Sequence, residues 1–183
     1  MQMHFTKHFG VGLALAAVTA FALAGGNVAI AQQQGGALAK QLQGTWSLVS
    51  IEVVAPDGSK KVGAFGPNPK GLFIFDSGGR YSIQLFRPGI PKFAANARDK
   101  GTAEENKAVV EGTLAHFGTY KVNEKESSFT VLPEASSYPN WTGVEQPPRK
   151  FTITGDQLSL TNPAPTVSSG VGGSALLVLK RVK

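Results

Sequence analysis

The chain has 183 residues, a formal net charge of +6 and no cysteine. This length suits a single domain, and the lack of cysteine excludes disulfides, thiol chemistry and a cysteine-linked lipid anchor. The basic residues are scattered among glycine, proline and aspartate instead of forming one stripe, so the sequence predicts ordinary solvated surface and no nucleic-acid partner.

The first 31 residues have the pattern of a secretory signal peptide. Lys7 supplies a weakly basic start, residues 11–23 are apolar, and Ala29-Ile30-Ala31 is a typical small-residue cleavage site. The apolar run is shorter than the roughly 20 residues that span a bilayer, and no second long apolar run follows. We therefore predict an exported bacterial protein, periplasmic or extracellular, whose mature chain has no transmembrane span.

The start of the predicted mature chain leads into a barrel signature. Residues 32–41 predict a flexible lead-in, and residues 38–42 favour one short helical turn at its end. Gly44-Thr45-Trp46 then heads a segment in which apolar and polar residues alternate. In small barrels such a tryptophan plugs one end, and the glycine allows a tight turn beneath it. Arg181 ends the last predicted strand, where its guanidinium is expected to lie across the indole of Trp46.

From Gly44 onward, strand and turn signals alternate with few interruptions. Period-2 alternation and the intervening turn residues predict strands at residues 46–54, 72–75, 80–86, 112–122, 127–133, 149–154, 157–161 and 174–182. One helix interrupts them, because Thr102 and Glu105 form a capping-box pattern and Gly112 ends the helical segment. This spacing predicts an all-β domain over residues 42–183, an antiparallel up-and-down β-barrel of about eight strands with one short inserted helix.

Several motifs follow one another along residues 40–161. They are Gly44-Thr45-Trp46, Phe65-Gly66-Pro67-Asn68-Pro69-Lys70-Gly71, residues 76–82, Arg87, Glu104-Glu105-Asn106-Lys107, His116-Phe117-Gly118-Thr119-Tyr120, Pro139-Asn140-Trp141 and residues 149–158. With them the chain resembles the lipocalin-like domain family found in bacterial and fungal proteins. The resemblance implies a calycin-type, lipocalin-like β-barrel whose interior can hold a small apolar molecule. It implies no particular reaction, because members of this family mostly lack an assigned activity.

His116 is the one histidine outside the predicted signal peptide. Period-2 alternation places it on the same strand face as Tyr120. If that face lines the barrel, the imidazole and the phenol can bind a ligand or act as an acid/base pair. The alternatives are a structural histidine whose hydrogen bonds are satisfied within the fold and a histidine that faces solvent opposite a core Phe117. One histidine without cysteine does not indicate a metal site, and no motif indicates a cofactor.

Other side chains are candidates for ligand contact. Arg80 is predicted to recognise an anionic head group, as are Arg87 and Arg149 from the barrel mouths, with exposed surface arginine as the alternative for each. Trp141, with Tyr138, is predicted to form an aromatic lid over the barrel mouth or to cover that end for stability. The predicted ligand-binding set, completed by the plug tryptophan, comprises Trp46, Arg80, His116, Tyr120 and Trp141.

The sequence leaves three functions open. The first is an exported binding protein that holds a small hydrophobic or amphipathic molecule in the barrel. The second is a cofactor-independent cyclase or isomerase that uses the same cavity, with His116 and Tyr120 as acid and base. The third is a protein-interaction or inhibitor barrel that acts through its long loops, with a protein partner that the sequence does not identify.

Overall fold

The computed structural model describes residues 35–55, 57–63, 65–162 and 174–183, so the predicted signal peptide lies outside the described residues. The elements are α2 (Ala37–Leu42), β1 (Gly44–Val54), β2 (Lys60–Val62), β3 (Lys70–Phe75), β4 (Arg80–Phe86), η1 (Arg98–Lys100), α3 (Ala103–Gly112), β5 (Thr113–Asn123), β6 (Ser128–Ser136), η2 (Pro139–Trp141), β7 (Arg149–Thr154), β8 (Gln157–Asn162) and β9 (Ser174–Arg181). None of the helices in this described part has both the length and the apolar character needed to span a membrane.

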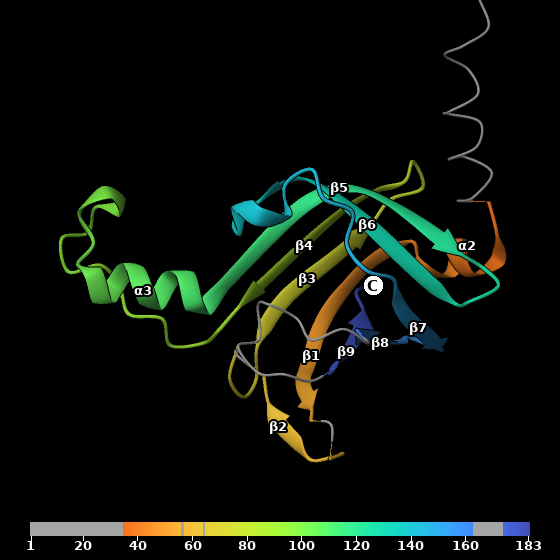
Figure 1. Cartoon of the computed structure of the whole chain (residues 1–183), viewed down its shortest axis with the longest axis horizontal. Coiled ribbons are helices and arrows are strands. Elements are labelled where there is room, and N and C mark those ends of the chain that lie inside the picture. The colour runs from red at the N-terminus through yellow and green to blue at the C-terminus, as the bar shows by residue number, and fades with distance from the viewer. Residues whose placement is uncertain (1–34, 56, 64, 163–173) are drawn as a thin grey trace, which may run out of the picture.

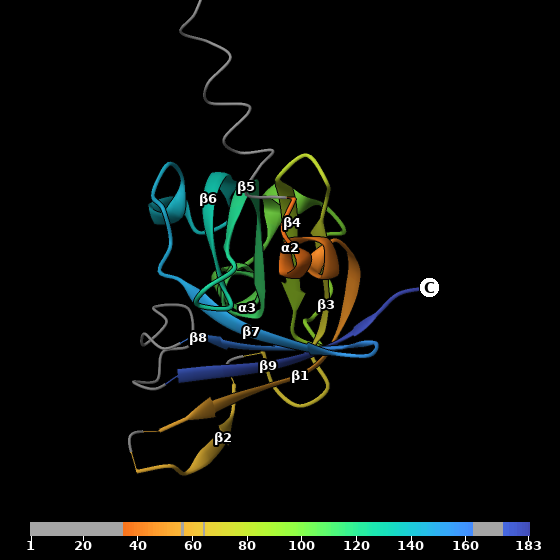
Figure 2. The ribbon, with the colours of Figure 1, turned by 90° about the vertical axis from the view of Figure 1, so that its right-hand side faces the viewer.

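Eight strands form a closed antiparallel barrel. β1 and β3 to β9 pair in chain order, and β9 returns to pair with β1 from Trp46–Arg181 to Val54–Ser174. β2 is a short additional strand that pairs with the far end of β1. In Figure 2, β7, β8 and β9 run across the view while β3 and β4 run up it, so the sheet wraps around the core as two crossing layers. The predicted up-and-down β-barrel with one inserted helix is confirmed.

Alternation of side chains explains how these strands enclose a core. In β5, every second residue from Leu114 to Val122 is buried. β4 buries Tyr81, Ile83 and Leu85 in the same way. Successive side chains of a strand point to opposite faces, so one face of each strand supplies the core and the other meets solvent. The inward row of β5 carries the only histidine of that strand.

Trp46 plugs one end of the barrel, as predicted. Its side chain is fully buried, and its Nε1 donates a 2.8 Å hydrogen bond to the carbonyl of Leu42. The guanidinium carbon of Arg181 lies 4.0 Å from the centroid of the indole, which confirms the expected cation–π contact. The same guanidinium donates to the carbonyls of Gln43 and Gln41 at 2.8 and 2.6 Å. Because these carbonyls end α2, the arginine also holds that helix against the plug.

α2 lies where a flexible lead-in through residue 41 is expected. Ala39 and Leu42 are fully buried in the core. The backbone N–H groups of Leu38 and Ala39 donate to the carboxylate of Glu124 at 3.0 and 2.9 Å. Glu124 lies between β5 and β6, so a carboxylate from elsewhere in the barrel satisfies open N–H groups of the first helical turn. Residues 37–41 are therefore a fixed part of the barrel end, and the short helical turn expected there is formed.

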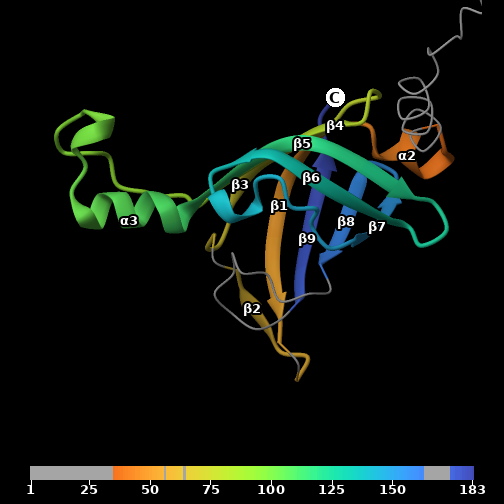
Figure 3. The ribbon, with the colours of Figure 1, turned by 45° about the horizontal axis from the view of Figure 1, so that its top comes forward.

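α3 extends away from the barrel between β4 and β5 (Figures 1 and 3). The Thr102 hydroxyl accepts from the Glu105 N–H at 3.2 Å, and the Glu105 carboxylate accepts from the Thr102 N–H at 2.9 Å, which confirms the predicted capping box. Glu105 also accepts from the N–H of Ala94 at 2.8 Å and so fixes the preceding loop. Of the α3 residues, only Gly112 is buried, where the helix passes directly into β5. The helix is thus an arm beside the core.

The seam between β6 and β7 has the shortest pairing among the described strands. The two strands pair at only two register positions, of which one is Phe129–Arg149. Residues 137–148, which connect them, lie along β6 beyond this point, where the N–H groups of Gly143 and Gln146 donate to β6 carbonyls at 2.8 and 2.9 Å. Beyond the short β6–β7 pairing, this loop therefore forms hydrogen bonds with β6 where a paired strand would otherwise do so.

Candidate functional site

A cavity lies inside the barrel, and about 70 Å³ of it is open to the centre of a water molecule. One water needs roughly 10–15 Å³ on this measure, so the cavity admits several waters or part of a small organic molecule. Its apolar walls include Ile51, Phe65, Phe73, Ile83, Leu85, Leu114 and Leu160. Trp141, Arg149, Asn162 and Leu177 also line it but are only partly buried, so the cavity approaches the surface beside them.

His116 is buried in the cavity wall and is hydrogen-bonded to Tyr81. The Tyr81 hydroxyl lies 2.8 Å from Nδ1 of the imidazole. Burial lowers the pKa of His116 to about 3, and the positive charge of Arg149 adds to this effect. Burial also raises the pKa of the Tyr81 phenol above its ordinary value. Both groups are therefore neutral at physiological pH and act as a hydrogen-bonded pair without charge.

The structure does not bring His116 and Tyr120 together as an acid/base pair. Both side chains point inward, but residues four apart on one strand are separated by about 13 Å, which is too far for a hydrogen bond. The Tyr120 hydroxyl instead donates to the carbonyl of Asp76 at 2.8 Å, and its ring meets Phe75 edge-on at 5.1 Å. His116 finds its partner on the neighbouring strand, because same-face residues of adjacent strands lie much closer.

Arg149 lies at the start of β7 and lines the cavity. Its guanidinium carbon lies 6.0 Å from the ring centroid of Phe129. Within the described residues, its side chain forms no ion pair. Burial lowers the pKa of Arg149 to about 10, so the group stays positively charged at neutral pH. An unneutralised cation thus stands beside the neutral Tyr81–His116 pair.

Trp141 meets the cavity from the loop that covers the β6–β7 seam. Its indole lies edge-on to the imidazole of His116, with ring centroids 5.4 Å apart, and edge-on to Tyr138 at 5.8 Å. The indole is partly exposed. It therefore stands between the cavity and solvent, where a ligand that enters beside the seam would touch it.

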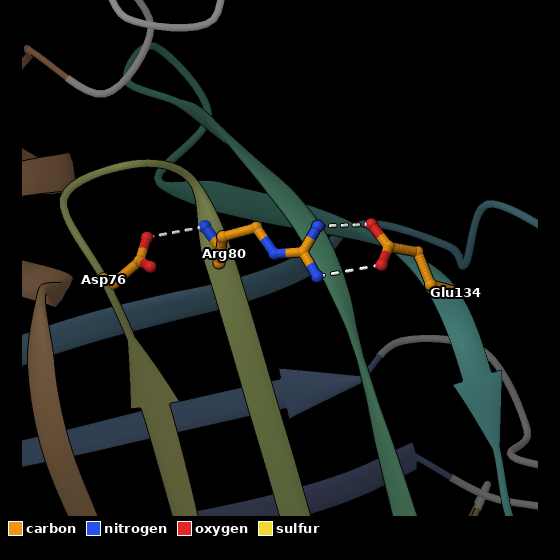
Figure 4. Close-up of polar contacts among 3 residues, drawn as sticks. All are labelled: Asp76, Arg80 and Glu134. Carbon is orange, nitrogen blue, oxygen red and sulfur yellow. Dashed lines mark hydrogen bonds and ion pairs between the residues drawn. The ribbon is translucent and has the colours of Figure 1, made fainter.

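Arg80 and Trp46 lie away from the cavity. The Arg80 guanidinium pairs with both carboxylate oxygens of Glu134 at 2.5 and 2.8 Å, and its backbone N–H donates to Asp76 at 2.7 Å (Figure 4). Both side chains of this ion pair are exposed, on the outer face of the barrel. Trp46 is the buried plug described above. Neither residue lines the cavity, so the anion contact expected of Arg80 has no place there.

The predicted ligand-binding set lacks Arg149 and Asn162, which line the cavity, and Tyr81, which is the hydrogen-bond partner of His116. Asn162 Oδ1 is buried and, among the described residues, accepts no hydrogen bond. Strand alternation holds a signal for Arg149, because it shares a face with the buried Phe151 two residues later. No comparable signal identifies Tyr81 as the partner of His116, since the register between two strands is not visible in either one.

The comparisons with known proteins agree with the fold. A family model described as a lipocalin-like domain matches residues 43–182. A curated relative, the 4'-hydroxy-3'-methoxypropiophenone carrier protein ppsC of Aspergillus oryzae, is 34% identical over 107 residues, which cover 55% of this chain and 96% of the relative. The match of the family model includes every strand of the barrel. The chain therefore belongs to the lipocalin-like domain family.

Proposed function

We propose that this protein binds a small hydrophobic or amphipathic molecule in the cavity of its barrel and acts as its carrier. The observation that supports this most directly is a mostly apolar cavity lined by a few polar groups, the usual composition of a small-molecule site. The Aspergillus oryzae relative is named as the carrier of 4'-hydroxy-3'-methoxypropiophenone. That compound combines an aromatic ring with few oxygen atoms, which suits a wall of this composition.

A second candidate function is cofactor-independent isomerisation or cyclisation in the same cavity. The 2.8 Å contact between Tyr81 and His116 favours it, because it lies within the range for proton transfer. A general base works best when its pKa is near the operating pH, however, and that of His116 is about 3. The pair is better suited to exchange hydrogen bonds with a ligand than to remove a proton from carbon, so the carrier function ranks first.

Titration calorimetry of the purified protein with 4'-hydroxy-3'-methoxypropiophenone tests both candidates. A carrier is expected to bind one molecule per chain and to release it unchanged when the complex is extracted and chromatographed. A new chromatographic peak that accumulates with time would favour the isomerase or cyclase. Absence of binding at millimolar concentration would count against a carrier of this class of compound.

Filling the cavity from β9 is expected to weaken binding. Leu177 lines the cavity, whereas its neighbour Leu176 lies on the other face of the same strand. Leu177→Trp should raise the dissociation constant for the propiophenone at least about tenfold, because the indole occupies the space of the ligand. Leu176→Trp, the matched control, should leave it within about twofold. Equal effects of the two substitutions in calorimetry would place the ligand outside the cavity.

A further inference from the structure

The cavity holds a positive charge that the chain does not neutralise. Arg149 has no carboxylate within ion-pair distance among the described residues. The groups around it are the Tyr81 phenol, the His116 imidazole and the ring of Phe129, none of which is negative. Withdrawing a guanidinium from water costs free energy unless an anion pairs with it. Arg149 is partly buried at the edge of the cavity, so an anion that enters the cavity from outside the chain would replace the water around it and neutralise it.

A second polar atom of the same cavity also lacks a partner. Asn162 Oδ1 is buried and accepts no hydrogen bond from the residues that the structure describes. Buried acceptors in folded proteins nearly always have a donor, and a hydroxyl group of a ligand in the cavity would supply one to this amide. The two residues would bind different groups of a ligand. The guanidinium of Arg149 pairs with a negatively charged oxygen, whereas Asn162 Oδ1 accepts a hydrogen bond from a hydroxyl or amine.

The remaining lining is suited to an aromatic ring. Phe65, Phe73, Trp141 and the imidazole of His116 face the cavity. Aromatic side chains favour edge-to-face and offset contacts with a further ring. Trp141 and His116 already meet edge-on at 5.4 Å, so a ring bound beside them would extend an existing aromatic cluster.

We propose, building on the carrier function, that the ligand is a small hydroxylated aromatic anion. Its carboxylate or acidic phenol oxygen pairs with the guanidinium of Arg149, and a hydroxyl group of the ligand donates to Asn162. The planar guanidinium offers several donors in one plane and therefore matches a carboxylate better than a point charge does. The neutral Tyr81–His116 pair provides uncharged hydrogen-bonding groups beside this contact without competing for the anion.

Benzoate and acetophenone separate the charge from the shape of the ligand, because a methyl group replaces one carboxylate oxygen. Calorimetry with the wild-type protein is expected to give at least about tenfold tighter binding of benzoate. Arg149→Met should remove this preference by weakening benzoate alone. Lys150→Met is the matched control, since it removes the same charge from the next, exposed residue, and should leave the preference intact.

The hydroxyl contact is tested with 3-hydroxybenzoate and 4-hydroxybenzoate. At least one of them should bind the wild-type protein more tightly than benzoate does. Asn162→Leu should abolish that advantage and leave benzoate itself within about twofold, because the carboxylate contact is at Arg149. If neither hydroxybenzoate gains over benzoate, the assignment of Asn162 as a ligand acceptor is wrong.

Thermal unfolding shows whether Arg149 serves ligand binding or the stability of the fold. Without ligand, Arg149→Met should unfold at the same temperature as the wild-type protein or higher, since it removes an unpaired cation from a mostly apolar site. Benzoate should raise the unfolding temperature of the wild-type protein and of Lys150→Met, but not that of Arg149→Met. A large loss of stability in Arg149→Met alone would assign the arginine to folding and overturn the inference.

The failure of this inference can be told apart from failure of the carrier function. If acetophenone and benzoate bind equally, or if the preference for benzoate survives Arg149→Met, the ligand is not held as an anion by Arg149 and the carrier function stands. Equal losses in Arg149→Met and Lys150→Met would indicate general surface attraction and would also overturn the inference. If neither compound binds the wild-type protein, the inference is wrong, and titration with the propiophenone decides separately whether the carrier function stands.

Discussion

Replacing Gly118 with alanine is expected to lower the free energy of unfolding by about 3 kcal/mol or more. β6 carries a bulge opposite this residue, because Phe117 and Gly118 pair with Ala135 and Pro133 and leave Glu134 as the extra residue. A Cβ at position 118 would overlap the backbone carbonyl of Leu132 and lie 2.8 Å from the nitrogen of Glu134. Both obstacles are backbone atoms, so no side-chain rotation relieves the overlap.

Urea unfolding measures the effect, with Gly78→Ala as the matched control. A Cβ at Gly78 would meet only the Asp76 carboxylate at 3.4 Å, which is ordinary contact. This control should change the free energy of unfolding by no more than about 0.5 kcal/mol. If Gly118→Ala proved as stable as the control, the bulge of β6 would have to move outward freely, and the close pairing of β5 and β6 described above would be incorrect.

His116 is expected to make the protein progressively less stable as the pH falls below 6.5. Its pKa is about 3 in the folded chain against an ordinary value of 6.5. Between these values the unfolded chain binds a proton that the folded chain does not, so the free energy of unfolding falls by up to about 1.4 kcal/mol for each unit of decreasing pH. At pH 4 the loss amounts to about 3 kcal/mol.

The variant His116→Asn isolates this contribution. Asparagine keeps a polar atom near Nδ1 for Tyr81 but does not titrate. Acidic groups whose pKa is lowered by hydrogen bonds, such as Asp57 and Asp156, also cost stability in acid, but they do so equally in both proteins. The difference between the wild-type and variant free energies, measured with urea from pH 7.5 to pH 4, should therefore shift in favour of the variant. A constant difference would mean that the imidazole is protonated within the fold.

Features that rest on local patterns were predictable from the sequence. Thr102 and Glu105 predict the start of a helix from four consecutive residues, and the capping box forms as expected. The Trp46–Arg181 contact is a longer inference, but it follows once the first and last strands are assumed to pair and close the barrel. Period-2 alternation also placed His116 and Tyr120 on one face of β5, as the structure has them, but it left open whether that face points into the barrel.

The composition of the cavity was less predictable, since it depends on register and on loops. Tyr81 reaches His116 only because the register between β4 and β5 sets Ile83 opposite His116. The sequence of either strand alone does not give this register. Arg80 and Arg149 look alike in sequence, yet the bulge of β6 sets Glu134 on the outer face to pair with Arg80, while β7 turns Arg149 toward the cavity. The loop that brings Trp141 to the rim has no periodic pattern from which its path can be read.

The positions of Trp46 and Trp141, the only two tryptophans in the chain, give the protein two optical reporters with separate meanings. The indole of Trp46 is sealed beneath Arg181, so its emission changes only when that end of the barrel comes apart. The indole of Trp141 stands at the rim of the cavity against His116, so its emission depends on what occupies the space beside it. Replacing Trp141 with phenylalanine leaves Trp46, whose emission reports whether that end of the barrel is intact. Replacing Trp46 with phenylalanine leaves Trp141, whose emission reports whether the cavity is occupied. The two processes can thus be timed independently in one molecule without an added dye.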